Sequence, residues 1–429
     1  MSIEVLDEIV RAQKRGEARG IASICSAHPY VLQSAMRQAA QTGAPVLVEA
    51  TCNQVNQFGG YTGMTPAAFV QFARRIAAEN NLPLERLLLG GDHLGPSPWQ
   101  DGPMERAMGR AADMVRAYVQ AGFTKIHLDA SMKLGDDNPA RPLEVELSAR
   151  RAAWLAKAAE ESLAKVSEPS QGLRYVIGTE VPIPGGATAH EDGVSVTRVE
   201  DARRTVEATH AAFLEAGLDA AWERVLAVVV QPGVEFGDDF VLDYKSAAAR
   251  DLSLFSETTS LVYEAHSTDY QTREALRSLV RDHFAILKVG PGLTFAFREA
   301  VFALAKIEDE LFPPENRSNL IQTLDNAMVQ HPEHWAKYYR GDQAEQAFKR
   351  RFSLSDRVRY YWPRPEVRSA LEKMLHNLES VSLPLALVGQ YFPRQVDEVR
   401  SRRLDLSPRA LIDHHIRSVL DDYTFACNG

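Results

Sequence analysis

Cysteine is scarce in this sequence, and long apolar runs are missing. The three cysteines, Cys25, Cys52 and Cys427, are an odd number at wide spacing, which argues against a disulfide framework and favours a reducing compartment. No pair of them has zinc-finger spacing. The longest apolar runs, such as Val225–Val230, have the length of a strand and fall far short of the roughly 20 residues that a membrane span needs. We therefore expect a cytoplasmic protein that does not contact a membrane.

Two further signals are missing. Residues 1–20 predict a charged helix rather than a signal peptide. No GxGxxG fingerprint follows the first predicted strand, which disfavours a doubly wound open sheet. The net charge of −9 argues against a nucleic-acid-binding protein, although it leaves room for a local basic pocket that holds a phosphate.

The sequence does contain a regular alternation of short apolar runs with helical patterns. Its 429 residues, 45% of them hydrophobic and 24% charged, are enough for a large barrel with an appendage. The eight candidate strands are Gly20–Pro29, Pro45–Gln54, Arg86–Pro96, Lys125–Met132, Arg174–Pro182, Val225–Gly233, Leu261–Tyr270 and Phe284–Gly292. Eight strand–helix units within roughly 300 residues predict the α/β class and a (β/α)8, or TIM, barrel.

Polar residues gather at the carboxyl ends of these predicted strands. They are Ser26, His28, Asn53, Asp92, His93, Asp129, Glu180, Gln231, Glu264, His266 and Lys288. In a (β/α)8 barrel these ends converge on one face, where the strand-to-helix loops build the site. We therefore expect one site at the mouth of the barrel.

The strand pattern stops at about Phe302. Beyond it the sequence predicts helices joined by short loops that contain proline and glycine. We expect two parts, a barrel over residues 1–310 and a helical extension over residues 311–429 that packs on it. Arg357 and Tyr360–Tyr361 of the extension are expected to line the substrate mouth.

Asp92 and His93 close the third predicted strand. Histidine is the commonest ligand of a catalytic divalent metal, and an adjacent carboxylate can move a proton. A capping Asp beside a packed His is the alternative for an isolated pair, but the position at a strand end favours a metal site. We predict that His93 binds the metal and that Asp92 is catalytic.

The seventh predicted strand supplies Glu264 and His266 on one face, because strand side chains alternate. We predict that His266 completes the metal site and that Glu264, Ser267 and Thr268 contact the substrate or its phosphate. The alternative is a histidine that only packs within the barrel layers.

Other strand ends complete the predicted site. Glu180 is expected as a metal ligand or general base, and Asp129 as a further catalytic group. Lys125 and His127 lie deeper and are expected to be structural. Lys288 is expected to bind phosphate, with a Schiff base as the alternative role. Gly290, Ser26 and Asn53 complete the predicted substrate-binding set.

Several long motifs resemble those of a known family. They are GGDHLGP, HLDASM, GTEVP, PGVEF, EAHSTDYQ, LKVGPGLTFAFREA, SLSDRVRYYWP and LVGQYFP, and the likeness runs from about Gly20 to Cys427. The family is GatZ/KbaZ, described as subunits of class II tagatose-bisphosphate aldolase, with relatives known as tagatose-6-phosphate 4-epimerases. The kinase label sometimes attached to this family has no support in the sequence, which lacks a P-loop GxxxxGK[ST].

The resemblance implies a barrel related to the catalytic class II aldolases. Asp92 and His93 match the proton-transfer acid and a zinc ligand of those enzymes, and His266 with Ser267 matches a second zinc ligand. Their third histidine ligand has no counterpart, and Gln231 or Glu180 is expected in its place. An oxygen-richer site favours Mn²⁺ over Zn²⁺, so either ion is expected as the cofactor.

Two functions fit these residues. The preferred one is a metal-dependent ketohexose-phosphate enzyme, a tagatose-6-phosphate 4-epimerase or aldolase that acts by retro-aldol chemistry. The alternative is a non-catalytic subunit that stabilises a separate class II aldolase chain. We expect a sugar phosphate as ligand, an aldolase catalytic subunit as the candidate partner, and a homo-oligomer.

Overall fold

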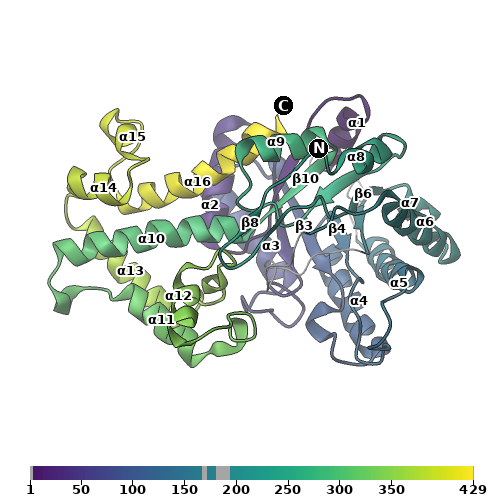
Figure 1. Cartoon of the computed structure of the whole chain (residues 1–429), viewed down its shortest axis with the longest axis horizontal. Helices are drawn as coiled ribbons and strands as arrows, with labels where there is room; N and C mark the ends of the chain where they lie inside the picture. Colours follow the sequence, from purple (N-terminus) through teal and green to yellow (C-terminus); the bar gives the residue numbers. More distant parts are fainter. Residues whose placement is uncertain (1–2, 167–171, 180–193, 429) are drawn as a thin grey trace.

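Eight parallel strands close into a barrel in the computed structural model, which describes residues 3–166, 172–179 and 194–428 (Figure 1). Around the barrel the strands follow the order β1-β10-β9-β6-β5-β4-β3-β2. Their bounds are β1 Ile21–Ile24, β2 Val46–Thr51, β3 Leu87–Leu94, β4 Lys125–Leu128, β5 Arg174–Ile177, β6 Val225–Val229, β9 Val262–Ala265 and β10 Phe284–Val289. Each predicted strand contains one of them, so the predicted (β/α)8 barrel is confirmed. A short hairpin, β7 (Glu235–Phe236) and β8 (Val241–Leu242), follows β6 and was not predicted.

Helices follow the strands and surround the barrel. They are α2 Pro29–Thr42, α3 Pro66–Glu79, α4 Met104–Ala121, α5 Val145–Leu163, α6 Val199–Glu215, α7 Asp219–Trp222, α8 Arg250–Glu257, α9 Arg273–Arg281 and α10 Pro291–Leu311. Proline stands in the first turn of α2, α3 and α10, where its missing N–H has no intrahelical partner to lose. Gly43 and Gly122 end α2 and α4 in the left-handed conformation, with φ of 72° and 98°.

The N-terminal helix α1 (Glu4–Lys14) closes the amino end of the barrel. Ile3, Leu6 and Ile9 pack on apolar interior side chains, among them Leu47 and Ile286. Strand side chains two residues apart share a face, so the layer above these contains charged residues such as Glu49 and Lys288. The barrel therefore changes from apolar to charged toward its carboxyl end.

The C-terminal part is helical, as expected. It contains α11 Leu320–Gln330, α12 Gln343–Phe352, the 3₁₀ helix η5 Arg357–Tyr360, α13 Pro365–Glu379, α14 Leu385–Tyr391, α15 Val396–Arg400 and α16 Pro408–Cys427. Helix α10 runs out of the barrel and α16 (yellow) runs back beside it to pack on α2 and α9 (Figure 1). The Tyr423 hydroxyl donates to the carbonyl of Thr268, 2.9 Å away. The last helix of the chain thus completes the helical layer around the barrel.

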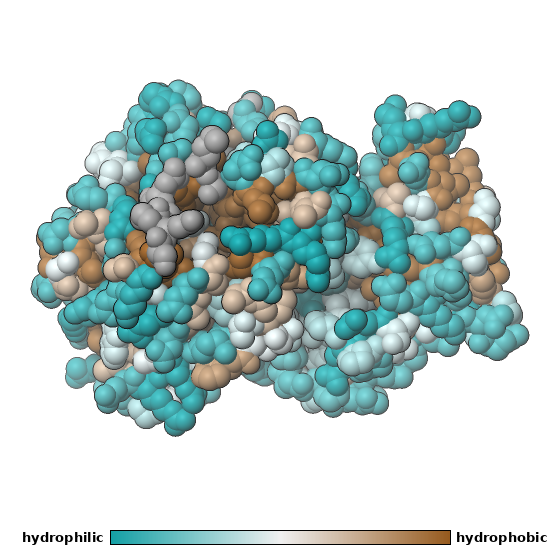
Figure 2. Space-filling model, turned by 180° about the vertical axis from the view of Figure 1, so that it is seen from behind, coloured by the Kyte–Doolittle hydropathy of each residue, from teal (hydrophilic) through white to brown (hydrophobic). Residues whose placement is uncertain are grey.

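Apolar side chains gather at the far end of the C-terminal part (right in Figure 2). In that part of the chain Val381, Leu385 and Leu406 are exposed by 40%, 43% and 37%. No helix in the described ranges has the length and apolar character to cross a membrane.

We expect Ile416→Ala in α16 to destabilise the protein by about 2–5 kcal/mol, because it leaves a cavity in the core on which α16 packs. Ile416 is fully buried. Urea unfolding followed by circular dichroism measures this, with Leu406→Ala as control. Equal stability of the two variants would mean that α16 adds little to the barrel.

Candidate functional site

A cavity opens at the carboxyl end of the barrel. Its lining residues are Cys25, Thr51, Asn53, Gln54, Tyr61, Asp92, His93, Phe236, His266, Ser267, Asp269, Lys288, Val289, Gly290, Pro291, Arg359 and Tyr360. Seven of them, Asn53, Asp92, His93, His266, Ser267, Lys288 and Gly290, belong to the set predicted from sequence. Strand ends far apart in the chain therefore meet here.

A bulge in β3 brings two consecutive side chains to this cavity. Gly91 pairs with Ile126 and Leu94 with Leu128, so β3 holds one residue more than β4 over this stretch. His93 adopts a left-handed φ of 49° at the bulge. Without it, Asp92 and His93 would point to opposite faces of the strand. Gly95 allows the close approach that follows, since a Cβ there would lie 1.6 Å from the carbonyl oxygen of Asp129.

Asp129 fixes the orientation of His93. The Nδ1 of His93 lies 2.8 Å from Oδ2 of Asp129, and the Ser131 hydroxyl donates to the other oxygen at 2.6 Å. Burial alone would lower the pKa of His93, but the carboxylates of Asp92 and Asp129 outweigh it and raise that pKa. The Nε2 of His93 is turned toward Asp92, 3.8 Å from Oδ2. His93 is therefore held as a group that can carry a proton at the cavity wall.

Two lysines and two glutamates form an ion network beneath the cavity. The Nζ of Lys125 lies 2.6 Å from both Glu49 and Glu264. The Nζ of Lys288 lies 2.5 Å from Glu49, 2.8 Å from Asp92 and 3.5 Å from Glu264. The side chains of these four residues and of Asp92 are all buried, where a charge requires a partner.

The network fixes the charge of its members. Burial opposes the charged forms, yet the pKa of Asp92 and Glu264 falls well below the usual range and that of Lys288 rises, because opposite charges are in contact. Glu49 has room to reach the lysines because Gly90 has no side chain: a Cβ there would lie 2.8 Å from its Cγ.

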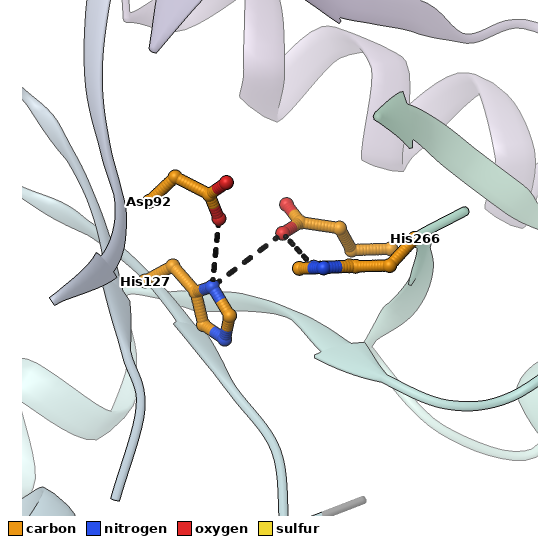
Figure 3. Close-up of side chains that lie close together, drawn as sticks. Asp92, His127 and His266 are labelled. Atoms are coloured by element: carbon orange, nitrogen blue, oxygen red, sulfur yellow. Dashed lines mark hydrogen bonds and ion pairs between the residues drawn. The ribbon is translucent and has the colours of Figure 1, made fainter. Parts of the chain in front are cut away.

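A second group beside the network has the donor atoms of a metal site. Figure 3 shows Asp92, His127 and His266 pointing toward one another. The Oε1 of Glu264 lies between the two histidines, 3.9 Å from the Nδ1 of His127. The Nδ1 of His127 is 3.1 Å from Asp92, and the Nε2 of His266 is 3.1 Å from Glu264. One donor atom from each of the four lies within 4.8 Å of all the others.

These residues fit a divalent metal ion. Two imidazoles and two carboxylates are a ligand set that Zn²⁺ and Mn²⁺ both accept. Burial lowers the pKa of His266 to about 4, so the ring is neutral at pH 7, as a ligand must be. The Nδ1 of His127 faces the group and also accepts the backbone N–H of His93 at 3.2 Å, a contact that a bound ion would replace. Lys288 already contacts Asp92 and Glu264, so a bound ion would share these oxygens with its ammonium group.

The candidate donor group differs from the ligand set predicted from the sequence. It includes His127, which was expected to be structural, and Glu264, which was predicted as a substrate contact. The ring of His93 lies 4.8 Å from that of His266 but outside the group. The side-chain oxygen of Gln231 accepts the N–H groups of Gly233 and Val234 and does not line the cavity. Glu180 lies outside the described residues.

The predicted phosphate contacts are mostly engaged elsewhere. The hydroxyl of Thr268 donates to the carbonyl of Lys288 at 2.6 Å, away from the cavity lining. Ser26 lines an adjoining outer cavity. The N–H of Gly290 donates to Asp269. Of the predicted set, Ser267 and Asn53 line the cavity beside Lys288.

The lining or supporting residues that the sequence analysis missed include Glu49, Arg359 and Tyr61. Glu49 was visible as a lone charge inside an apolar strand, Val46–Thr51. Arg359 and Tyr61 gave no signal, because their loops are brought to the mouth only by folding. Of the extension residues expected there, Tyr360 lines the cavity, whereas Arg357 stacks on Tyr338.

Asp269 should make stability depend on pH. Burial raises the pKa of its carboxyl from 3.8 to about 6. The folded state therefore binds this proton more tightly than the unfolded state does. The protonated carboxyl stabilises the folded state fully below pH 3.8, and this contribution is lost as the pH rises through about 6. We expect wild-type stability to fall by about 1–3 kcal/mol relative to Asp269→Asn between pH 4 and pH 7. Urea unfolding over this range measures it; parallel curves, as expected for the surface control Asp405→Asn, would contradict it.

The fold and the mouth define a (β/α)8-barrel protein with a polar, charged site at the carboxyl end of its strands. The chain belongs to the D-tagatose-1,6-bisphosphate aldolase subunit GatZ/KbaZ-like family, whose model matches residues 6–428. It is 52% identical over 424 residues, 99% of each chain, to the D-tagatose-1,6-bisphosphate aldolase subunit GatZ of Klebsiella pneumoniae. It is 51% identical to that of Salmonella gallinarum, over 98% of this chain and 99% of the other.

A solved structure agrees with the family. A probable tagatose 6 phosphate kinase from Sinorhizobium meliloti is 46% identical, with a TM-score of 0.87, over 95% of this chain and 100% of that one. The predicted membership of the GatZ/KbaZ family is therefore confirmed.

Proposed function

We propose that this chain is a subunit of a D-tagatose-1,6-bisphosphate aldolase, which binds a sugar phosphate in its barrel mouth and stabilises a separate catalytic chain. The observation that carries the proposal is 52% identity over 99% of both chains to a protein of that name.

Two features of the molecule support a partner role. Asp92, the expected proton-transfer acid, is held by Lys288 at 2.8 Å and His127 at 3.1 Å, which limits its freedom as a base. Val381, Leu385 and Leu406 leave apolar area exposed in the C-terminal part, where a bound partner would bury it.

The test is to co-express the chain with a class II aldolase catalytic chain. We expect no cleavage of D-tagatose 1,6-bisphosphate by this chain alone, and a severalfold longer half-life of the partner's activity at 37 °C when it is present. Leu385→Glu should weaken this protection and Glu315→Gln should not. An unchanged half-life with the wild type would contradict the proposal.

A metal-dependent 4-epimerase is the second candidate, favoured by the donor group of Asp92, His127, Glu264 and His266. C4 of a 2-ketohexose is not adjacent to the carbonyl, so proton abstraction alone cannot invert it. Breaking the C3–C4 bond leaves its electron pair on C3, in the fragment that holds C1 to C3, while the C4 hydroxyl loses its proton and C4 becomes an aldehyde. Re-addition to the other face of the aldehyde then inverts C4.

The residues have separate tasks in that reaction. A bound divalent ion would supply Lewis-acid polarisation of the C2 carbonyl. Asp92 or His93, side by side at the cavity wall, would take the C4 hydroxyl proton and return it. Incubation of the purified chain with tagatose 6-phosphate tests this. Fructose 6-phosphate that EDTA abolishes supports the epimerase, and no turnover by the metal-loaded chain rules it out.

A further inference from the structure

Arg359 is a cation at the cavity that contacts no carboxylate of a described residue, although Asp269 and Asp356 act on it electrostatically. It belongs to the 3₁₀ helix η5 and is partly buried where the cavity meets the C-terminal part. Its guanidinium donates to the carbonyls of Ser355, at 2.5 Å, and Asp356, at 3.0 Å, and to the hydroxyl of Tyr360, at 3.1 Å. No carboxylate of a described residue forms an ion pair with it. A guanidinium so placed is suited to a phosphate, which accepts paired N–H donors.

The other cations of the cavity region are already neutralised. Lys288 contacts Glu49 and Asp92, and Lys125 contacts Glu49 and Glu264, all within 2.8 Å. Residues 180–193, which are not described, contain no lysine or arginine in the sequence. Within this chain, Arg359 is therefore the cation that an anion in the cavity can use.

The usual backbone phosphate position of a barrel is also occupied. In many barrels the loop after the last strand and the following helix start bind a phosphate through N–H groups. Here Oδ1 of Asp269 accepts the N–H of Gly290 at 2.9 Å and of Gly292 at 2.7 Å, at the start of α10. A negatively charged carboxylate in this place repels a second phosphate.

Two contacts hold Arg359 in position from the barrel side. Asp356, which begins η5 in a left-handed conformation with φ of 45°, binds Arg298 at 2.8 Å and Thr294 at 2.6 Å, both on α10. The Tyr360 ring packs against Tyr61 of the loop after β2, 4.7 Å between centroids. The 3₁₀ helix η5, and Arg359 with it, is thus attached to the barrel although it belongs to the C-terminal part.

We propose that Arg359, with the hydroxyl of Tyr360 beside it, binds the single phosphate of a ketose monophosphate whose sugar carbons face Asp92 and His93. This rests on the proposed sugar-phosphate mouth and adds that the ligand is a monophosphate rather than the bisphosphate of the aldolase partner. The mouth of this chain is then a separate binding site and not a second copy of the partner's active site.

Calorimetric titration of the full purified chain tests the proposal with three probes: D-tagatose 6-phosphate, D-tagatose and D-tagatose 1,6-bisphosphate. We expect the monophosphate to bind about tenfold or more tightly than the free sugar, and the bisphosphate no more tightly than the monophosphate. Arg359→Gln should lose about tenfold or more for the monophosphate, and Arg359→Lys should lose less.

Arg368→Gln is the matched control, because it removes an exposed arginine of the adjoining outer cavity. Its binding should stay within twofold of the wild type. A loss confined to Arg368→Gln, equal binding of sugar and monophosphate, clearly tighter bisphosphate binding, or no binding at all would each overturn the proposal. If Arg359→Gln does not fold, Arg359→Lys and the three wild-type titrations decide. The aldolase half-life assay stays independent, since Arg359→Gln should still protect the partner.

Discussion

Replacing Lys288 with methionine is expected to destabilise the folded chain by about 3–5 kcal/mol, the largest stability effect that we predict for one substitution. Methionine fills a similar volume but leaves Glu49 and Asp92 without the ammonium group that lies 2.5 and 2.8 Å from them. Glu49 is fully buried and does not line the cavity, so water cannot replace the ammonium group there. Urea unfolding followed by circular dichroism at pH 7 measures the change.

Lys306→Met is the matched control for this substitution. Lys306 pairs with Asp309 at 3.1 Å on the surface, with its side chain 54% exposed, and such pairs contribute at most about 1 kcal/mol. Similar losses of unfolding free energy in the two variants would mean that the buried carboxylates do not depend on the positive charge of Lys288. A Lys288→Met chain that is destabilised at pH 7 but regains its stability at acid pH would support this dependence on charge, since protonated carboxyls need no counter-charge.

His266→Ala is expected to weaken binding of Mn²⁺ or Zn²⁺ by about 100-fold or more. The imidazole supplies one of four donor atoms that lie within 4.8 Å of one another, and its removal leaves the ion to water. Binding is measured by competition with a chelator and by metal analysis after dialysis. His266→Ala should keep the circular dichroism spectrum and most of the stability, because the ring lines the open cavity.

The control for metal binding is His415→Ala, since His415 lies in α16 and contacts Glu299 at the surface. It should bind the ion as the wild type does. His93→Ala separates the two candidate ligand sets: loss of binding would restore His93 as a ligand, and retained binding would assign it to proton transfer beside Asp129. A wild-type chain that holds neither ion would contradict the metal site and exclude the epimerase as described.

A strand pattern could predict only some of the candidate metal ligands. Period-two alternation correctly brought Glu264 and His266 to one face, but it could not show that His127 reaches the same donors. Gln231 stands at a strand end, as a ligand would, yet its side chain accepts the backbone N–H groups of the turn that follows. Local hydrogen bonds to the backbone compete with a distant site, and a linear pattern does not distinguish the two.

The sequence by itself determined the barrel, because eight apolar runs alternate with helical patterns and no GxGxxG follows the first of them. It also determined that Asp92, His93, His266 and Lys288 meet at one mouth, since parallel strands end on the same face. The tertiary structure decided how they meet. The β3 bulge turns Asp92 and His93 to the same cavity, and the network of buried charges engages Lys288. Folding of the C-terminal part brings Arg359 to the rim. These contacts join residues far apart in the chain, and their distances depend on packing that no local pattern encodes.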